Sequence, residues 1–391
     1  MPPFVPSVSP AFVALALLLA VSGTVYCGFI LRITFGIGLE PARSKALQPS
    51  GLTVAVVIAA CNEAANIAAC LDSLTRQRRA PDEIILIDDA SEDATVAIAE
   101  GFESSLPTQL RIVRLPVPSG KKAAIAAGIA VAQSEIIACT DADCTVPETW
   151  ISEITTSFAG AGVGVVSMPV FYREDCEGQT LFEKTEALEF LSLIGVGASL
   201  VWSGTPAICN GANLAYLKSA WQQAGGFAAS RFTSGDDEHV MRQIFRAGYK
   251  VIFNASPEAA VTTPGTGNLK AFLKQRIRWA SKGTGYREIS LGFVLTLALL
   301  YVFNLVVLLS PLWMWFGDAW ILAAGFAVAV KCSVDFFSMR RIAVRFGKAK
   351  WMRYFFFAEL LQLLYVSVCA PAAQLARISG GYTWKGRRIW Q

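Results

Sequence analysis

Four apolar stretches, each long enough to cross a lipid bilayer, constrain the fold of this 391-residue chain most strongly. A transmembrane helix needs about 20 consecutive apolar residues. The stretches that reach this length cover residues 11–31, 291–316, 319–337 and 354–376. The last one contains Glu359 and Pro371, which also suit a re-entrant segment, so we predict three or four spans. The sequence thus predicts a multi-pass membrane protein with an N-terminal anchor over residues 1–35 and a C-terminal membrane region over residues 290–391.

Basic residues beside these stretches predict the side of the membrane on which the rest of the chain lies. Arg32, Arg43 and Lys45 follow the first stretch, and no basic residue precedes it. Because basic flanks stay in the cytoplasm, we expect the 260 or so residues up to the second stretch to be cytoplasmic, and we expect no cleaved signal peptide. The nine cysteines form no CxxC pair, which fits a reducing compartment. We therefore expect a bacterial inner-membrane protein.

The C-terminal charges conflict with four full spans. The tail, with Lys385 and Arg388, and the loop 340–353 are both basic, and they cannot both be cytoplasmic if residues 354–376 cross fully. This conflict leaves the number of spans open.

The region between the first two stretches alternates β-rich apolar runs with helical stretches. The predicted strands cover residues 53–60, 83–87, 111–115 and 135–140. This alternation predicts an α/β domain with a parallel sheet covered on both faces, which we bound at residues 50–285. In such sheets ligands bind beyond the carboxyl ends of the strands, and two acidic clusters fall there.

The first cluster is Asp141-Ala142-Asp143. Residues two apart in an extended chain point to the same side. Two carboxylates presented together suit Mg²⁺ or Mn²⁺, which also bind phosphates. A solvated acidic loop is the alternative.

The second cluster is Asp88-Asp89, and a helix opens nearby at Gly120-Lys121. A carboxylate at position 88 or 89 can accept hydrogen bonds from a base or a ribose, with helix capping by Ser91 or Asp93 as the alternative. Backbone N–H groups at a helix start beside the Lys121 ammonium favour phosphate, with a solvated helix start as the alternative.

Asp236 and Asp237 stand in a run of four ionisable residues that ends at His239. Crowded carboxylates raise one another's pKa, which helps one of them act as a general base. A surface acidic turn is the alternative. His239 is the only histidine in the chain, which argues against hydrolase mechanisms that need a histidine.

An amphipathic helix is predicted over residues 269–281, just before a membrane stretch. We expect Arg276 or Arg278 to hold a diphosphate and Trp279 to stack on a sugar. A helix lying at the membrane interface is the alternative.

In their order along the chain, these residues resemble the family 2 glycosyltransferases, especially the membrane-bound, synthase-like branch that includes cellulose and hyaluronan synthases. The similarity covers about residues 53–285. The matching segments are Asn62-Glu63, DDASEDAT at 88–95, Gly120-Lys121, the DxD at 141–143, Asn210-Gly211-Ala212-Asn213, Gly225-Gly226-Phe227, Asp236-Asp237 and the QxxRW signature from Gln275 to Trp279.

The resemblance implies a GT-A fold, an inverting reaction and a nucleotide-sugar donor, usually a UDP-sugar. It makes Asp237 the general base with Asp236 beside it, and it assigns the metal to Asp143 and Asp141. It also implies substrate binding by Glu63, Asp88, Asp89, Lys121, Asp141, Asn213, Gln275, Arg276, Arg278 and Trp279.

The acceptor stays open between a membrane lipid and a growing polysaccharide. A non-catalytic membrane subunit that binds sugar nucleotides or assembles polysaccharide is the alternative function. No basic array interleaved with aromatic residues occurs in the soluble part, so we expect no nucleic-acid partner.

Overall fold

The computed structural model describes residues 10–41, 48–174, 179–227, 236–281, 291–378, 382–384 and 387–389. Of the residues used in the sequence predictions, Arg43, Lys45, Lys385 and Arg388 lie outside these ranges or carry no described side chain, and only the backbone of Asp236 is described. The chain divides into two compact units, which we describe separately. The first comprises Met1–Phe35 with Leu269–Thr383, and the second comprises Gly36–Asn268 with Trp384–Gln391.

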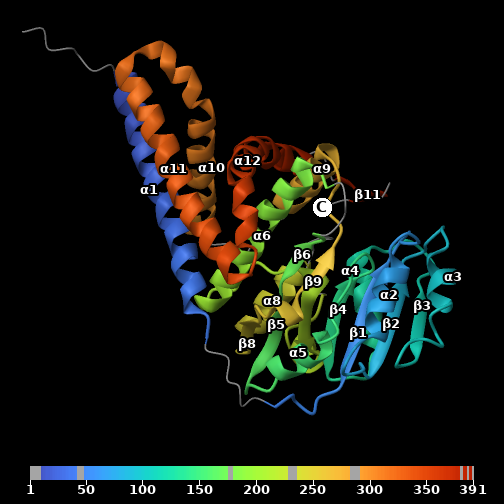
Figure 1. Ribbon diagram of the computed structural model, residues 1–391. Coiled ribbons are helices and arrows are strands. Elements are labelled where there is room, and N and C mark those ends of the chain that lie inside the picture. The colour runs from blue at the N-terminus through green and yellow to red at the C-terminus, as the bar shows by residue number, and fades with distance from the viewer. Residues whose placement is uncertain are drawn as a thin grey trace, which may run out of the picture. The chain divides into compact units, whose positions relative to one another are not determined.

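The second unit is built on a seven-stranded sheet with the strand order β3-β2-β1-β4-β7-β5-β8 (Figure 1). Its strands are β1 (Val54–Ala60), β2 (Glu83–Asp88), β3 (Leu110–Arg114), β4 (Ile136–Asp141), β5 (Val163–Ser167), β7 (Leu214–Leu217) and β8 (Lys250–Phe253). The first four are parallel, as the strand–helix alternation predicts, which confirms the α/β class. Strand β7, which we did not predict, runs antiparallel to both β4 and β5. A small second sheet pairs β6 (Val170–Tyr172) with β9 (Val261–Thr263).

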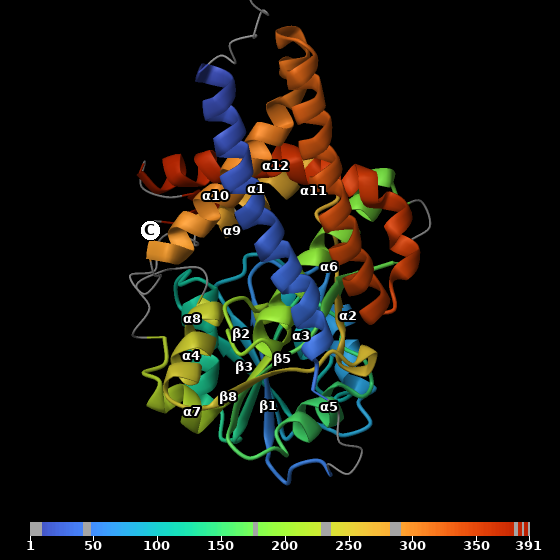
Figure 2. The ribbon, with the colours of Figure 1, turned by 90° about the vertical axis from the view of Figure 1, so that its left-hand side faces the viewer.

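Helices cover both faces of the large sheet (Figure 2). The helices of this unit are α2 (Ile67–Thr75), α3 (Thr95–Glu100), α4 (Lys121–Val131), α5 (Trp150–Ser157), α6 (Leu181–Trp202), α7 (Lys218–Gln223) and α8 (Asp236–Arg246), with short 3-10 turns η1 (Ile37–Leu39), η2 (Gly211–Asn213) and η3 (Pro257–Ala259). On one face, apolar residues of α4, α7 and α8 pack against alternate residues of β1, β2 and β4, such as Val57, Ile85 and Ile137. Because side chains alternate along a strand, the intervening residues face the helices on the other side, where Figure 2 places α2 and α5.

The strand register brings the predicted site segments to one edge of the sheet. Ala60 at the end of β1 pairs with Asp88 of β2, and Ala59 pairs with Asp141 of β4. Three parallel strands therefore end at the same level, and the loops that follow them start side by side.

Helix α6 is a feature that we did not predict. It is long and apolar enough to cross a membrane, yet 72% of its apolar window is buried in the protein. Its first turn has a capping box between Thr180 and Glu183, and its last residue, Trp202, donates from Nε1 to the carbonyl of Phe253 in β8 at 3.2 Å. A helix that is apolar on all sides belongs either in a bilayer or in a protein core, and here the contacts place it in the core.

The first unit is helical and contains the four predicted membrane stretches. Its elements are α1 (Pro10–Gly36), α9 (Leu269–Ala280), α10 (Leu291–Leu309), η4 (Ser310–Phe316), α11 (Asp318–Arg345), η5 (Ala349–Tyr354) and α12 (Phe355–Ile378). By length and composition, four segments could each cross a membrane: Phe12–Leu39, Val294–Trp313, Asp318–Arg345 and Ala349–Leu375. Between 11% and 28% of their apolar windows is buried, which leaves apolar surface for a bilayer to cover. Strands β10 (Tyr382–Trp384) and β11 (Arg387–Ile389) pair near the C-terminus.

The division between the units differs from the predicted boundary at residue 285. Helix α9, which carries the QxxRW signature, belongs to the first unit by its contacts. Phe272 packs edge-on against Tyr365 of α12 at a centroid distance of 5.2 Å, and Phe272 is fully buried. The apolar side of the amphipathic helix is therefore covered by a helix of its own unit.

Candidate active site

The loop after β1 is attached to the loop after β2 by side-chain hydrogen bonds. The backbone N–H of Asn62 donates to Ser91 Oγ at 3.0 Å, and that of Glu63 donates to Thr95 Oγ1 at 2.8 Å. The carboxylate of Asp93 accepts from Ala64 N at 3.0 Å. Ser91 and Asp93 thus join two loops at the sheet edge, and the position of Glu63 depends on both loops.

Asp88 and Asp89 are both buried and hold the loops around the site. Asp88 Oδ1 accepts from the backbone N–H of Ser91 at 3.1 Å. Asp89 accepts from two successive N–H groups, Ser119 N at 2.6 Å and Gly120 N at 2.9 Å. The two aspartates are 4% and 2% exposed. These hydrogen bonds position the backbone, and the predicted contact with a base or ribose stays a prediction.

Through these two hydrogen bonds Asp89 holds the backbone just before helix α4, whose first residue is Lys121. Gly120 has a φ of +85°, a conformation that glycine adopts without strain, and it directly precedes the helix. From the first position of α4, Lys121 forms an ion pair with Asp141 at the end of β4. Both side chains are about one-third exposed, so the pair is open to a ligand.

Asp143 lies in a strongly negative environment. Burial raises its pKa to about 6, and the neighbouring carboxylates Asp141 and Glu63 act in the same direction, with only partial compensation from Lys121. Burial and the two neighbouring carboxylates thus make Asp143 harder to ionise, and a cation bound beside it would offset this effect. The structure thus brings Glu63, Asp141, Asp143 and Lys121 together, as the order of their segments predicts.

Three residues that we did not single out support the Asp141–Asp143 turn. Cys144 Sγ donates to Asp143 Oδ1 at 3.5 Å, Cys70 Sγ donates to the carbonyl of Asp141 at 3.6 Å, and Arg173 Nη2 donates to the carbonyl of Asp143 at 3.1 Å. Burial, followed by the nearby aspartates, raises the pKa of both thiols, so they stay protonated donors. The position of Cys144 directly after the DxD was the only sequence signal for this role.

The chemistry of this carboxylate group fits a divalent cation. Asp141 and Asp143 supply hard oxygen ligands, and a bound cation would favour the ionised form of Asp143, whose pKa is raised. Within the described part of the chain, no group of three or more His, Cys, Asp and Glu side chains is arranged to enclose a metal ion. Asp141 and Asp143 would supply two of the ligands of such a cation.

Asp237 lies in the first turn of α8 and is oriented by backbone donors. Its Oδ2 accepts from Gly211 N at 2.9 Å, and its Oδ1 accepts from Glu238 N at 3.0 Å. Gly211 begins the η2 turn, so the predicted Asn210–Asn213 segment and the predicted base are in direct contact. Each carboxylate oxygen has a second lone pair that can accept a proton.

Asn213 is enclosed by the domain. It is fully buried, and its Oδ1 accepts from Trp150 Nε1 at 2.8 Å. Its Nδ2 donates to the carbonyls of Pro169 and Ala259 at 2.7 and 2.8 Å. An amide whose hydrogen bonds are used inside the domain positions the η2 turn, and the predicted contact of Asn213 with substrate stays a prediction.

Arg276 is likewise enclosed by its own unit, and its predicted contact with the diphosphate stays a prediction. Its guanidinium lies 4.4 Å from the ring centroids of both Phe272 and Trp279, and 5.9 Å from that of Tyr365. Nη1 also donates to Gln275 Oε1 at 2.5 Å, and the residue is 3% exposed. The roles of Gln275, Trp279 and Arg278, the last of which is partly exposed, stay predictions.

Comparisons with known proteins agree with this arrangement. Residues 55–224 match the profile described as glycosyl transferase family 2. Over 207 residues the chain is 27% identical to glycosyltransferase AglE of Haloferax volcanii, an alignment that covers 51% of this chain and 64% of that protein. Over 263 residues it is 26% identical to the poly-beta-1,6-N-acetyl-D-glucosamine synthase of Staphylococcus epidermidis, covering 67% of this chain and 61% of that one. The chain thus spans less than two thirds of the length of these relatives.

Among solved structures, the chain is similar to a mannosyltransferase of Pyrobaculum calidifontis, determined with GDP-mannose and Mn²⁺. The TM-score is 0.56 at 20% identity, and the alignment covers 89% of this chain and 99% of that chain. This likeness shows a common fold. Residues 55–224 of this chain are therefore similar to the family 2 glycosyltransferases, and the domain that contains them has the GT-A fold.

Proposed function

We propose that this protein is an inverting glycosyltransferase of the membrane that transfers a sugar from a nucleoside diphosphate donor, usually a UDP-sugar in this family, to a lipid or a growing polysaccharide. The observation that carries the proposal is the group of Glu63, Asp141 and Asp143 at the sheet edge, where the pKa of Asp143 is raised to about 6. A site with uncompensated negative charge next to a lysine suits a metal-bound diphosphate.

In this proposal Lys121 binds the diphosphate of the donor. Its ammonium already pairs with Asp141 and stands at the start of α4, where the N–H groups of the helix also favour phosphate. Asp141 and Asp143 would hold Mg²⁺ or Mn²⁺, and such an ion would offset the charge of the departing nucleoside diphosphate. Arg278 and Trp279 are assigned to the diphosphate and the sugar.

Asp237 acts as the general base. It takes the proton of an acceptor hydroxyl while that oxygen forms a bond to the anomeric carbon. The bond from the anomeric carbon to the phosphate oxygen breaks, and its electron pair leaves with the nucleoside diphosphate. The N–H groups of Gly211 and Glu238 hold the carboxylate in one orientation during this step.

The four apolar segments of the first unit would anchor the enzyme in the inner membrane, with the glycosyltransferase domain in the cytoplasm. We assign no membrane span to α6, because most of its apolar window is already buried. A catalytic domain anchored in this way meets acceptors at the membrane surface, where lipids and nascent polysaccharides are available.

The test is nucleotide release by the purified full-length protein in detergent, with UDP-, GDP- and dTDP-sugars, Mg²⁺ or Mn²⁺, and a membrane extract as acceptor. Asp143→Asn and Asp237→Asn should each abolish metal-dependent release. Glu148→Gln is the matched control, since this carboxylate is 56% exposed in a surface ion pair and should leave release unchanged. A folded protein that binds nucleotide but releases none from any donor would be the non-catalytic subunit.

A further inference from the structure

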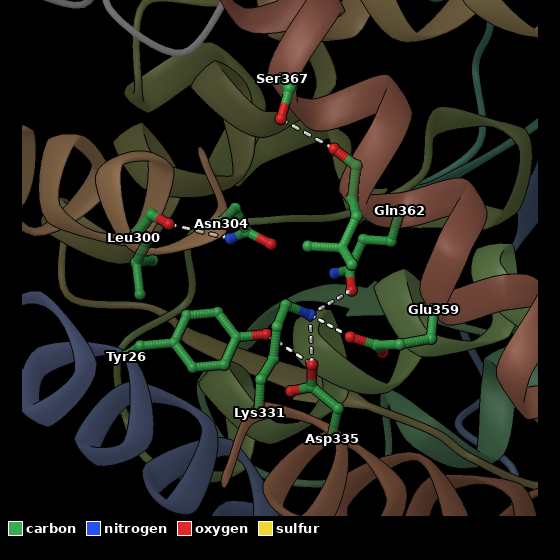
Figure 3. Close-up of polar contacts among 9 residues, drawn as sticks. Tyr26, Leu300, Asn304, Lys331, Asp335, Glu359, Gln362 and Ser367 are labelled. Atoms are coloured by element: carbon green, nitrogen blue, oxygen red, sulfur yellow. Dashed lines mark hydrogen bonds and ion pairs between the residues drawn. The ribbon is translucent and has the colours of Figure 1, made fainter. Parts of the chain in front are cut away.

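A cluster of polar side chains joins three helices inside the first unit (Figure 3). Lys331 Nζ of α11 donates to Asp335 Oδ2 at 2.7 Å and also pairs with Glu359 of α12. Tyr26 of α1 donates its hydroxyl to the same Asp335 oxygen at 2.6 Å. Gln362, one turn after Glu359, lies 3.4 Å from Lys331 Nζ through its Oε1. Residues more than 300 positions apart in the sequence thus meet in one polar layer.

The cluster is shielded from solvent and lies within segments suited to cross a membrane. The side chain of Lys331 is 0% exposed, and those of Asp335 and Glu359 are 5% exposed. Ionisable groups at such positions are costly and need internal partners. One cation facing two ionised carboxylates would leave a net negative charge in a medium that does not solvate it.

The hydrogen bonds of Glu359 indicate how this charge is balanced. One of its oxygens pairs with Lys331, whereas the other, Oε2, is buried and has no hydrogen-bond partner among the residues that the structure describes. The carboxyl groups of Glu359 and Asp335 are also close enough to interact directly. Two carboxylates repel at that distance, whereas a protonated carboxyl donates a hydrogen bond to an ionised one.

We propose that Asp335 and Glu359 together bind one proton, so that this cluster is a proton-binding site within the membrane-spanning unit. With one proton, the charges of Lys331 and the carboxyl pair cancel. A metal ion in place of the proton is disfavoured, because the described residues offer no group of three or more His, Cys, Asp and Glu ligands.

The groups around the pair add no further charge. Helix α1 contributes Tyr26 and the thiol of Cys27, and α11 contributes the thiol of Cys332 beside Lys331. From α10, Asn304 is 5% exposed and its Oδ1 is buried without a hydrogen-bond partner. Tyr301 Oη lies 3.5 Å from the carbonyl of Ser367 in α12. Lys331 is thus the one cation among the described groups that face the carboxyl pair.

Proton binding would matter for α9 as well. Tyr365 and Cys369, which follow Gln362 on α12, contact Phe272 and the carbonyl of Leu273 in α9. A charge-neutral cluster keeps α12 attached to α1 and α11, and through α12 it holds the helix that bears the QxxRW signature.

The test is infrared spectroscopy of the full-length protein in detergent at pH 7, where the surface carboxylates and Asp143 are largely ionised. A carbonyl band of a protonated carboxylic acid should be present. It should disappear in Glu359→Gln and also in Asp335→Asn, because the single remaining carboxylate then pairs with Lys331 as an ion. The exposed Glu148→Gln control should retain the band. A band that persists in both variants would overturn the proposal.

Thermal unfolding tests the same site without relying on catalysis. The folded protein binds a proton that the unfolded chain releases above about pH 4.3, so stability should fall as pH rises from there until the folded site also loses its proton. Glu359→Gln keeps a neutral donor and should remove this loss, whereas Glu359→Leu should lower the midpoint at every pH. A wild-type midpoint that responds to Na⁺ and not to pH would mean that a metal cation fills the site, and would overturn the assignment to a proton.

Discussion

Replacing Gly211 by alanine should slow catalysis by moving Asp237. A Cβ atom at position 211 would stand 3.0 Å from Oδ2, 3.3 Å from Cβ and 3.5 Å from Cγ of Asp237. Contacts this short force the neighbour to shift by a few tenths of an ångström. The backbone N–H that orients Asp237 remains, and the φ of Gly211 is not positive, so the substitution changes mainly the position of the carboxylate.

The size of the effect follows from the geometric demands of proton transfer. A misplacement of about 1 Å can cost about 100-fold in rate. A shift of a few tenths of an ångström should therefore lower kcat roughly 3- to 10-fold, which corresponds to about 0.7–1.4 kcal/mol in activation free energy. Donor affinity should stay unchanged, because we assign the donor to Lys121 and the DxD.

The assay is steady-state nucleotide release together with nucleotide binding at equilibrium. Gly51→Ala is the matched control, since a Cβ at that position meets nothing within 4 Å and its φ is not positive. An unchanged kcat in Gly211→Ala would refute the assignment of Asp237 as the base. A parallel loss of nucleotide binding and thermal stability would show that the substitution disturbs the fold and not one carboxylate.

Three further results are expected. Mn²⁺ affinity, measured by calorimetry, should fall about tenfold per pH unit below about pH 6, because the protonated form of Asp143 cannot ligate a metal. A constant affinity from pH 7 to pH 5 would contradict the raised pKa of Asp143. Asp89→Asn should destabilise the protein by about 2–4 kcal/mol, because the Asp89 carboxylate accepts two backbone N–H bonds and the NH₂ group of asparagine would face one of these donors. A thermal midpoint equal to that of the wild type would show that the loop does not depend on this residue. Asn213→Ala should lower the free energy of unfolding by about 3 kcal/mol or more, since Trp150 Nε1 and the carbonyls of Pro169 and Ala259 lose buried partners. A higher KM at unchanged stability would instead support a substrate contact for Asn213.

Local sequence patterns were sufficient for the elements whose formation depends on nearby residues. The apolar stretches and the four parallel strands follow from hydrophobic length and from strand–helix alternation. The position of Glu63, Asp88, Asp89, Asp141 and Asp143 at one edge follows from the same pattern, because parallel strands end together. The amphipathic helix predicted over residues 269–281 starts at the observed first residue and ends one residue beyond the observed last residue, Ala280.

Other features depend on contacts between distant segments, and no local pattern contains them. Residues of α6 are apolar enough for a membrane, and only the contacts with β6 and β8 decide that the helix is part of the core. The antiparallel direction of β7 likewise depends on the path of the chain between β5 and β8.

The roles of individual polar side chains divide in the same way. The sequence by itself determined which residue types are available for phosphate, metal and proton chemistry. Only the tertiary structure decided that Asn213 and Arg276 are enclosed by the protein and that the pKa of Asp143 is raised, first of all by burial. It also brought Lys331, Asp335 and Glu359 together from two helices. The physical reason is that burial and charge compensation arise from neighbours in space, and those neighbours are set by packing across the whole fold.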